Sequence, residues 1–190
     1  MKPPVFFKTL KDRYVAVQSE RRQVAHRCSD AQNMAKRAIF AMHRHDMKGA
    51  QTLLQDASRL LSESETILKK FSEIAREGIY QAAVEEYAEA RLFEQFLTSG
   101  GLAKGEARIM SPETYFAALS DATGELVRYA LREATNGNMP AVGTARQTVE
   151  MAIEFLLSMD LTGYQRQKFD QAKRNLRSLE QIQYETRLKG

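Results

Sequence analysis

An apolar seam with heptad spacing runs along the first part of the chain and limits the folds that the chain can adopt. From Leu10 to Met42, apolar and small residues recur at alternating steps of four and three, as in a helix that packs lengthwise against other helices. The seam consists of Leu10, Tyr14, Val17, Arg21, Val24, Cys28, Ala31, Ala35, Ala38 and Met42. A helix over residues 5–46 cannot bury this seam against itself, so a bundle neighbour or a second subunit must cover it.

The remaining sequence predicts further helices and no strands. Only four prolines occur in 190 residues, which leaves long stretches free of helix breakers. Amphipathic stripes predict helices at about 49–75, 79–99, 111–136, 140–163 and 163–190, with a loop at 100–110. Ser111 and Pro112 have the residue types of an N-cap followed by a first helical position. We expect an all-α bundle of about six to seven helices with a long N-terminal helix, as a single domain over residues 1–190.

The composition excludes several classes of protein. The one cysteine, Cys28, rules out an intramolecular disulfide framework and a cysteine-based zinc site, and its place on the seam favours a core role. No apolar run is long enough to cross a bilayer, and no secretory leader is visible. The expected location is therefore cytoplasmic.

Positive charge is concentrated near the start of the chain. Residues 1–48 hold eleven Lys or Arg and four acids, whereas the whole chain has a net charge of +4. A basic first segment joined to an acidic body suggests a polyanionic partner such as a nucleic acid. A solvated helix face explains the same charges equally well.

Two acidic motifs are the strongest indication of chemistry. Glu86 and Glu89 are spaced i,i+3 in one expected helix, and Asp121 and Glu125 are spaced i,i+4 in a later one. Each spacing places both carboxylates on one helical face. If the two helices pack together, four acids converge.

Four oxygen ligands suit Mg²⁺ or Mn²⁺ better than zinc or copper. The three histidines lie far upstream in sequence, so we expect an all-oxygen site. Small residues beside Asp121, including Gly124, suggest close approach of another backbone. Two simpler explanations remain open: the first pair of acids reaches solvent, or Glu125 only pairs with Arg128 on its own helix.

The motifs resemble those of a known family. Glu86-Tyr87-Ala88-Glu89-Ala90 and Asp121-Ala122-Thr123-Gly124-Glu125-Leu126-Val127-Arg128 are similar to two segments of the translin family, in its translin-associated factor X branch. Lys36-Arg37-Ala38-Ile39-Phe40 and His43-Arg44 resemble the family's first helix. The likeness covers roughly residues 13–190, and Glu85 departs from it, because glutamine is usual there.

The resemblance implies a Mg²⁺- or Mn²⁺-dependent endoribonuclease that cleaves single-stranded RNA, with single-stranded DNA as a further possible ligand. It implies a closed homo-oligomeric ring or capsule, a hexamer to octamer, and a prokaryotic or archaeal member. The catalytic and metal-binding acids would be Glu86, Glu89, Asp121 and Glu125, with a metal-activated water attacking the phosphodiester. The RNA contacts would be Lys36, Arg37, Arg44 and Arg128.

Two other functions fit the same residues. All-α nucleoside triphosphate pyrophosphatases also present paired acids to Mg²⁺, although their usual second pair is Glu-x-x-Asp. A non-catalytic ring that binds single-stranded nucleic acid would use the acids only to pair with Arg128 or Arg132.

Overall fold

The computed structural model describes residues 4–74, 78–102 and 110–189, and within these ranges it contains helices and no strand. The six helices are α1 (Val5–His43), α2 (Met47–Lys70), α3 (Ile79–Ser99), α4 (Pro112–Thr135), α5 (Met139–Leu157) and α6 (Gly163–Lys189). The predicted all-α bundle with a long first helix is confirmed. None of the helices in the described ranges has the length and apolarity needed to span a bilayer.

Local capping signals explain where several helices begin and end. The Ser111 hydroxyl accepts a hydrogen bond from the Thr114 amide, and Pro112 is the first residue of α4, as predicted. At α2 the prediction was wrong by a few residues at each end. Asp46 caps the helix by accepting from the Gly49 amide at 2.9 Å, so α2 begins at Met47, and it ends at Lys70 rather than near Ala75.

Three further helix ends can be compared with the sequence. α5 ends at Leu157 rather than near residue 163, so that prediction was wrong by about two turns. α1 ends at His43 rather than near residue 46, because the chain turns at His45, which has a φ of 63°. α3 ends at Ser99, as predicted, and Gly100 caps it with a φ of 72°, the left-handed conformation that glycine adopts without steric cost. Most of the loop predicted at 100–110 lies outside the described residues.

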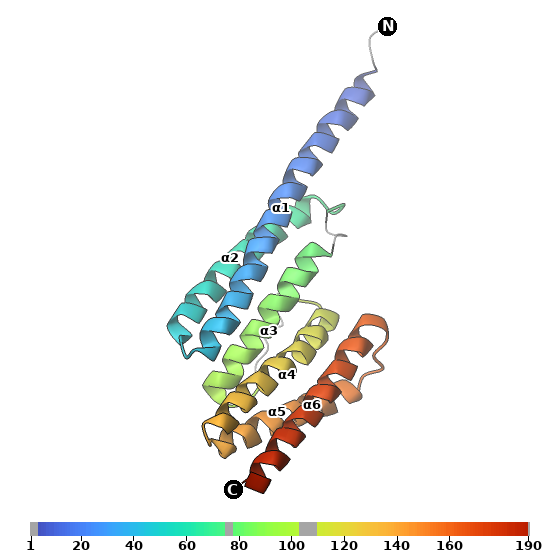
Figure 1. Cartoon of the computed structure of the whole chain (residues 1–190). Helices are drawn as coiled ribbons and strands as arrows, with labels where there is room; N and C mark the ends of the chain where they lie inside the picture. The colour runs from blue at the N-terminus through green and yellow to red at the C-terminus, as the bar shows by residue number, and fades with distance from the viewer. Residues whose placement is uncertain (1–3, 75–77, 103–109, 190) are drawn as a thin grey trace.

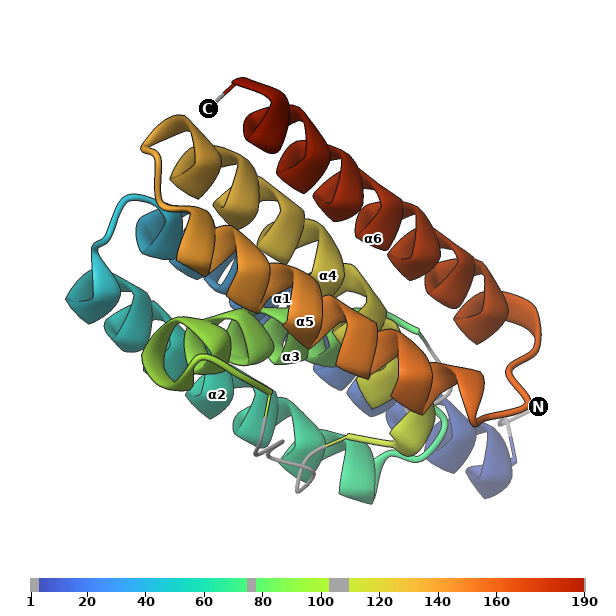
Figure 2. The same cartoon turned by 90° about the horizontal axis from the view of Figure 1, so that it is seen from below.

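Helices α3 and α4 occupy the middle of the bundle. α1 and α2 form an antiparallel hairpin that packs on α3, while α5 and α6 pack on α4 (Figure 1). Seen from below, α2 and α6 lie at opposite edges of the bundle (Figure 2). This arrangement places the two acidic motifs, one on each central helix, inside the bundle of this single chain.

Two hydrophobic clusters meet at α3. The larger one draws on all six helices, most heavily on α1, α2 and α3, and includes Cys28, Leu61 and Phe93. The smaller one joins α3 to α4, α5 and α6 around Leu119 and Phe169. Because α3 contributes to both clusters, it is buried on two sides, and polar residues on it must find partners or a ligand.

The first turns of α1 project beyond the rest of the bundle (Figure 1). The predicted seam is buried from Val17 to Met42, apart from the half-buried Arg21. Leu10 and Tyr14 are 56% and 63% exposed, so for this part of the seam only the second alternative, a further subunit, stays a prediction. The chain after α2 reaches this level of α1, where Glu73 pairs with Arg13, but it leaves Leu10 and Tyr14 exposed.

Candidate metal and nucleic-acid site

The two acidic motifs lie together between α3 and α4. Burial, together with the negative charges of Asp121, Glu86 and Glu125, raises the pKa of the Glu89 carboxyl to about 8. Carboxylates affect one another in this way only when they are close. The structure therefore brings the four acids near one another between the two helices.

Of the four acids, Glu89 has the fewest partners that could balance a negative charge on its carboxylate. It forms no hydrogen bond or ion pair with any residue that the structure describes. A carboxylate that is mostly buried and has no partner is costly to ionise, so its proton is retained to higher pH. Positive charge delivered by a ligand would remove that cost.

Glu125 is held by two side chains, one of which is a histidine. The imidazole Nε2 of His43 donates to the Glu125 Oε2 at 2.6 Å, and Arg128 donates to the same carboxylate at 2.9 Å. Although burial acts to raise the pKa of Glu125, these contacts hold it below its ordinary value. The end of α1 lies beside α4 despite the distance in sequence, and this places His43 next to the acids, where the sequence did not predict a histidine.

Asp121 is paired with a lysine from α6. The Lys168 ammonium donates to the Asp121 carboxylate and lies 3.0 Å from the Glu85 Oε1. Burial raises the pKa of Asp121, and Lys168 partly offsets this. Tyr164, one turn before Lys168, donates its hydroxyl to the Glu85 Oε1 at 2.6 Å.

Glu86 faces the first helix. The Lys36 ammonium lies 3.6 Å from the Glu86 Oε2. Burial raises the pKa of Glu86, and Lys36 acts in the opposite direction. The explanation in which this acid simply reaches solvent does not hold, since its side chain is 19% exposed.

The predicted RNA contacts divide into two pairs. Lys36 and Arg128 lie at the acids, and the Arg128 guanidinium also lies over the Phe40 ring, 5.3 Å from its centre. Arg37, on α1, and Arg44, directly after its end, are exposed and form no ion pair with a described residue. Their role as contacts to RNA stays a prediction.

The donor set fits a hard divalent cation in kind, because it is made of carboxylate oxygens around an uncompensated Glu89. The geometry is not that of a finished ligand set. Within residues 4–74, 78–102 and 110–189, no three His, Cys, Asp or Glu side chains are arranged so that they could hold a metal ion. Three of the four acids are turned toward protein cations instead: Glu86 toward Lys36, Asp121 toward Lys168, and Glu125 toward His43 and Arg128.

The glycine beside Asp121 does not serve the purpose that we expected. A Cβ placed on Gly124 would meet the Asn175 Nδ2 at 3.6 Å, an ordinary van der Waals distance. No other backbone approaches it closely, so that expectation was wrong.

Four residues at the site were not predicted from the sequence: His43, Glu85, Tyr164 and Lys168. His43 stood within a segment that carries the family resemblance, which was a usable signal. Tyr164 and Lys168 have an i,i+4 spacing that is common on any helix, so nothing local distinguished them.

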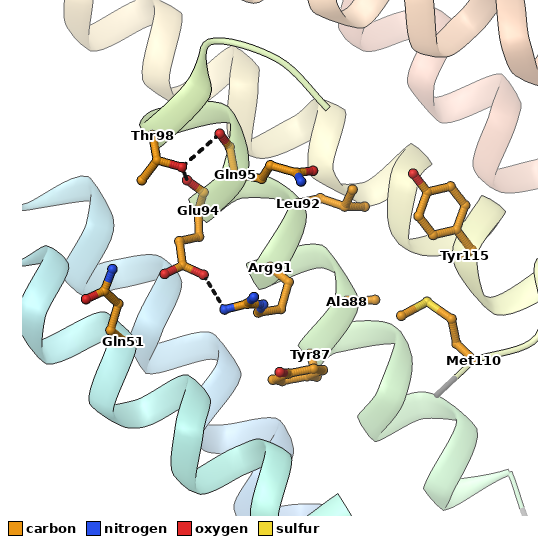
Figure 3. A pocket seen from close by; sticks show the side chains of 10 residues that line it. All are labelled: Gln51, Tyr87, Ala88, Arg91, Leu92, Glu94, Gln95, Thr98, Met110 and Tyr115. Atoms are coloured by element: carbon orange, nitrogen blue, oxygen red, sulfur yellow. Dashed lines mark hydrogen bonds and ion pairs between the residues drawn. The ribbon is translucent and has the colours of Figure 1, made fainter. Parts of the chain in front are cut away.

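A separate pocket of about 280 Å³ lies between α2, α3 and the start of α4 (Figure 3). Arg91 donates to Glu94 at 2.7 Å across its floor, and Gln51, Tyr87 and Tyr115 line its walls. None of the four acids lines it. It is therefore distinct from the candidate site.

A second cavity, of about 380 Å³, adjoins the acids directly. Glu86 and Asp121 line one part of it, and Tyr164 and Lys168 line another. A ligand at the acids would therefore have space to extend toward α6.

Comparison with known proteins places this arrangement in a family. The chain has the fold of the crystal structure of apo-NeC3PO, with a TM-score of 0.89, 20% identity and coverage of 98% of this chain and 100% of that chain. The crystal structure of AfC3PO aligns with a TM-score of 0.85, 18% identity and coverage of 97% and 98%. The AfC3PO–duplex RNA complex aligns with a TM-score of 0.81, 18% identity and coverage of 97% of each chain.

At these identities the three structures establish the fold alone. No curated protein matches the chain significantly. The model of the Translin family, however, matches residues 19–190, which include both acidic motifs and all of the side chains that contact them. The chain therefore belongs to the Translin family.

Proposed function

We propose that the chain is the subunit of a Mg²⁺- or Mn²⁺-dependent endoribonuclease that cleaves single-stranded RNA. The observation that carries this proposal is the meeting of Glu86, Glu89, Asp121 and Glu125 between α3 and α4, with Glu89 buried and unpaired. The resemblance of both motifs to the translin-associated factor X branch supports a catalytic rather than a purely binding member.

The acids have distinct roles in this proposal. Glu86, Glu89 and Asp121 would supply oxygen ligands, and Glu125 would complete the set in an orientation fixed by the hydrogen bond from His43. When bound, a divalent cation supplies charge stabilisation to the phosphodiester oxygens and a nucleophile at neutral pH. Glu89 would give up its proton as positive charge arrives, since its raised pKa results from burial and from neighbouring negative charge.

Basic residues around the acids would bind the RNA backbone. Arg128 and Lys36 lie at the edge of the site, and Arg37 and Arg44 continue the positive charge along α1. Such contacts supply affinity that falls with rising salt. A related chain, AfC3PO, has been crystallised with duplex RNA, which supports RNA as the ligand class here and makes duplex RNA a necessary comparison.

The proposed assembly is a homo-oligomeric ring or capsule. The projecting end of α1 exposes Phe6, Phe7, Leu10 and Tyr14, and exposed apolar surface of this kind favours self-association. The described chain offers no intramolecular partner for this surface, so we assign it to a second copy.

The proposal is tested by cleavage of a labelled single-stranded RNA in Mg²⁺ and in EDTA, with the same sequence as a duplex for comparison. Wild-type protein should cleave the single strand only with metal. Glu89→Gln and Asp121→Asn should abolish cleavage while RNA binding persists. Glu154→Gln, an exposed acid on α5 outside the site, is the matched control and should cleave normally. Full activity in Glu89→Gln would refute the site.

A non-catalytic RNA-binding role is the second candidate. It is favoured by the ion pairs that already hold Glu86, Asp121 and Glu125. Metal-independent binding without cleavage would support this role. Rapid pyrophosphate release from a nucleoside triphosphate panel would instead support the pyrophosphatase alternative.

A further inference from the structure

Lys168 connects the four acids with the cavity beside them. Its ammonium contacts the Asp121 carboxylate on one side and the Glu85 carboxylate, at 3.0 Å, on the other. All three side chains are largely buried, with exposures of 22%, 24% and 16%. This is not an ordinary surface ion pair, because a single cation compensates two partly buried carboxylates.

Tyr164 holds the arrangement from the same helix. Its hydroxyl donates to the Glu85 Oε1 at 2.6 Å, and the Lys168 ammonium lies 5.1 Å from the centre of its ring. The ring itself is half exposed and lines the 380 Å³ cavity. The cavity therefore presents an aromatic face and an ammonium group next to Asp121.

Asp121 cannot serve a divalent cation and the Lys168 ammonium equally. Two cations on one carboxylate repel each other, and the doubly charged one gains more from the surrounding acids. Lysine has a flexible four-carbon stem, so its ammonium can leave Asp121 without any movement of α6. Glu85 keeps it near the mouth of the cavity.

We infer that Lys168 is a substrate-binding residue that becomes available when Asp121 takes a divalent cation. This inference rests on the proposed function. The released ammonium contacts the phosphate of the nucleotide next to the scissile bond, and the base of that nucleotide stacks on Tyr164. The ligand class is a single-stranded ribonucleotide segment, because only an unpaired base can lie flat on an aromatic ring in this way.

The test uses Lys168→Met and a matched control, Lys173→Met. Lys173 is on the same helix, but it pairs with the exposed Asp170, outside the site. Two affinities are measured for full-length protein: that for Mn²⁺ alone, and that for a labelled single-stranded RNA in EDTA and in Ca²⁺, with gels to confirm that the RNA stays intact.

Loss of the competing ammonium should tighten Mn²⁺ binding by Lys168→Met about threefold or more. RNA affinity should fall roughly tenfold in Ca²⁺, and it should be unchanged in EDTA, where Lys168 is already engaged. Lys168→Arg should retain RNA affinity in Ca²⁺, which shows that the site remains folded. Lys173→Met should match wild type in every measurement.

The inference is overturned if Lys168→Met weakens Mn²⁺ binding, or if RNA affinity changes equally with and without metal. Tyr164→Ala adds an independent check, because loss of stacking should lower RNA affinity in Ca²⁺ roughly tenfold, whereas Tyr164→Phe should not. These readouts need no cleavage. An inactive wild type with the expected affinities would refute the nuclease and leave the role of Lys168 standing. If the wild type cleaves RNA but Lys168→Met has wild-type affinities for Mn²⁺ and RNA, the nuclease proposal stands and the role of Lys168 is refuted.

Discussion

The imidazole of His43 donates to the carboxylate of Glu125 across 2.6 Å, and this bond ties the end of α1 to the middle of α4. His43 also packs against Phe93, with ring centres 4.7 Å apart. Both side chains of the hydrogen bond are largely buried, with exposures of 11% and 15%. The bond therefore contributes to the fold and to the orientation of a proposed metal ligand at once.

Replacement of this histidine should destabilise the protein. His43→Ala removes a buried partner of a charged group, and such losses cost about 1–3 kcal/mol. The free energy of unfolding in urea measures the effect. His26→Ala is the matched control, because His26 lies on the same helix and pairs with Asp30 at an exposed position; its effect should stay within about 0.5 kcal/mol. If Glu125→Gln and His43→Ala prove additive in a double-mutant cycle, the bond is not coupling the two helices.

Glu89 should make the metal-free protein less stable as pH rises. Its pKa is raised in the folded state to about 8, above the ordinary 4.5. A carboxyl of this kind favours folding while it is protonated, so the contribution is present below about pH 4.5 and is lost as pH rises through 8.

Glu89→Gln should flatten that dependence and raise the thermal midpoint at pH 8. The corresponding gain in the free energy of unfolding should be on the order of a few kcal/mol. The same substitution should abolish cleavage, so stability and activity would change in opposite directions. Thermal unfolding in EDTA from pH 5 to 9 measures this, with Glu154→Gln as the control. Parallel curves for wild type and Glu89→Gln would contradict the prediction.

Gly124 should be replaceable without loss of the fold. It lies inside α4, and an added methyl group would meet only the amide of Asn175 at contact distance. Gly124→Ala should therefore stabilise the protein by about 1 kcal/mol, because alanine restricts the unfolded chain and favours helix. Gly137→Ala offers the contrast, since Gly137 has a φ of 77° and an alanine there should be strained and destabilising. Chemical denaturation of the two variants should move in opposite directions.

The exposed end of α1 should govern particle size. Leu10→Glu places a charge on the apolar surface that we assign to a second copy, and it should lower the particle mass measured by light scattering. Lys11 lies on the same turn and borders the same apolar surface. Lys11→Glu changes the net charge by more than Leu10→Glu does, but it removes no apolar side chain, so it should lower the particle mass less. A particle of unchanged mass in Leu10→Glu would show that subunits associate through another surface.

Local periodicity explains how much of the fold was predictable. The seam of α1 and the spacing of Glu86, Glu89, Asp121 and Glu125 are properties of single helices, and both predictions agree with the structure. The heptad pattern states that a seam must be covered, but it does not say by what. This is why the pattern identified Val17 and Leu10 alike, although only Val17 is buried within the chain.

The partners of the acids could not be predicted from the sequence. Lys168 reaches Asp121 across 47 positions, and His43 reaches Glu125 across 82. Such pairs depend on how α1 and α6 pack on the central helices, which no spacing within one helix records. The acids were recognisable as a group, whereas the cations that hold them were visible only in three dimensions.

The burial of α3 on two sides has a consequence for how the protein unfolds. Its residues Phe93 and Leu92 belong to different hydrophobic clusters, although they are neighbours in the chain. Detachment of either hairpin would therefore expose one side of α3. The other hairpin would then pack on a destabilised helix. Such a chain should melt in a single cooperative step, with the slowest amide exchange in the segment that carries Glu86 and Glu89.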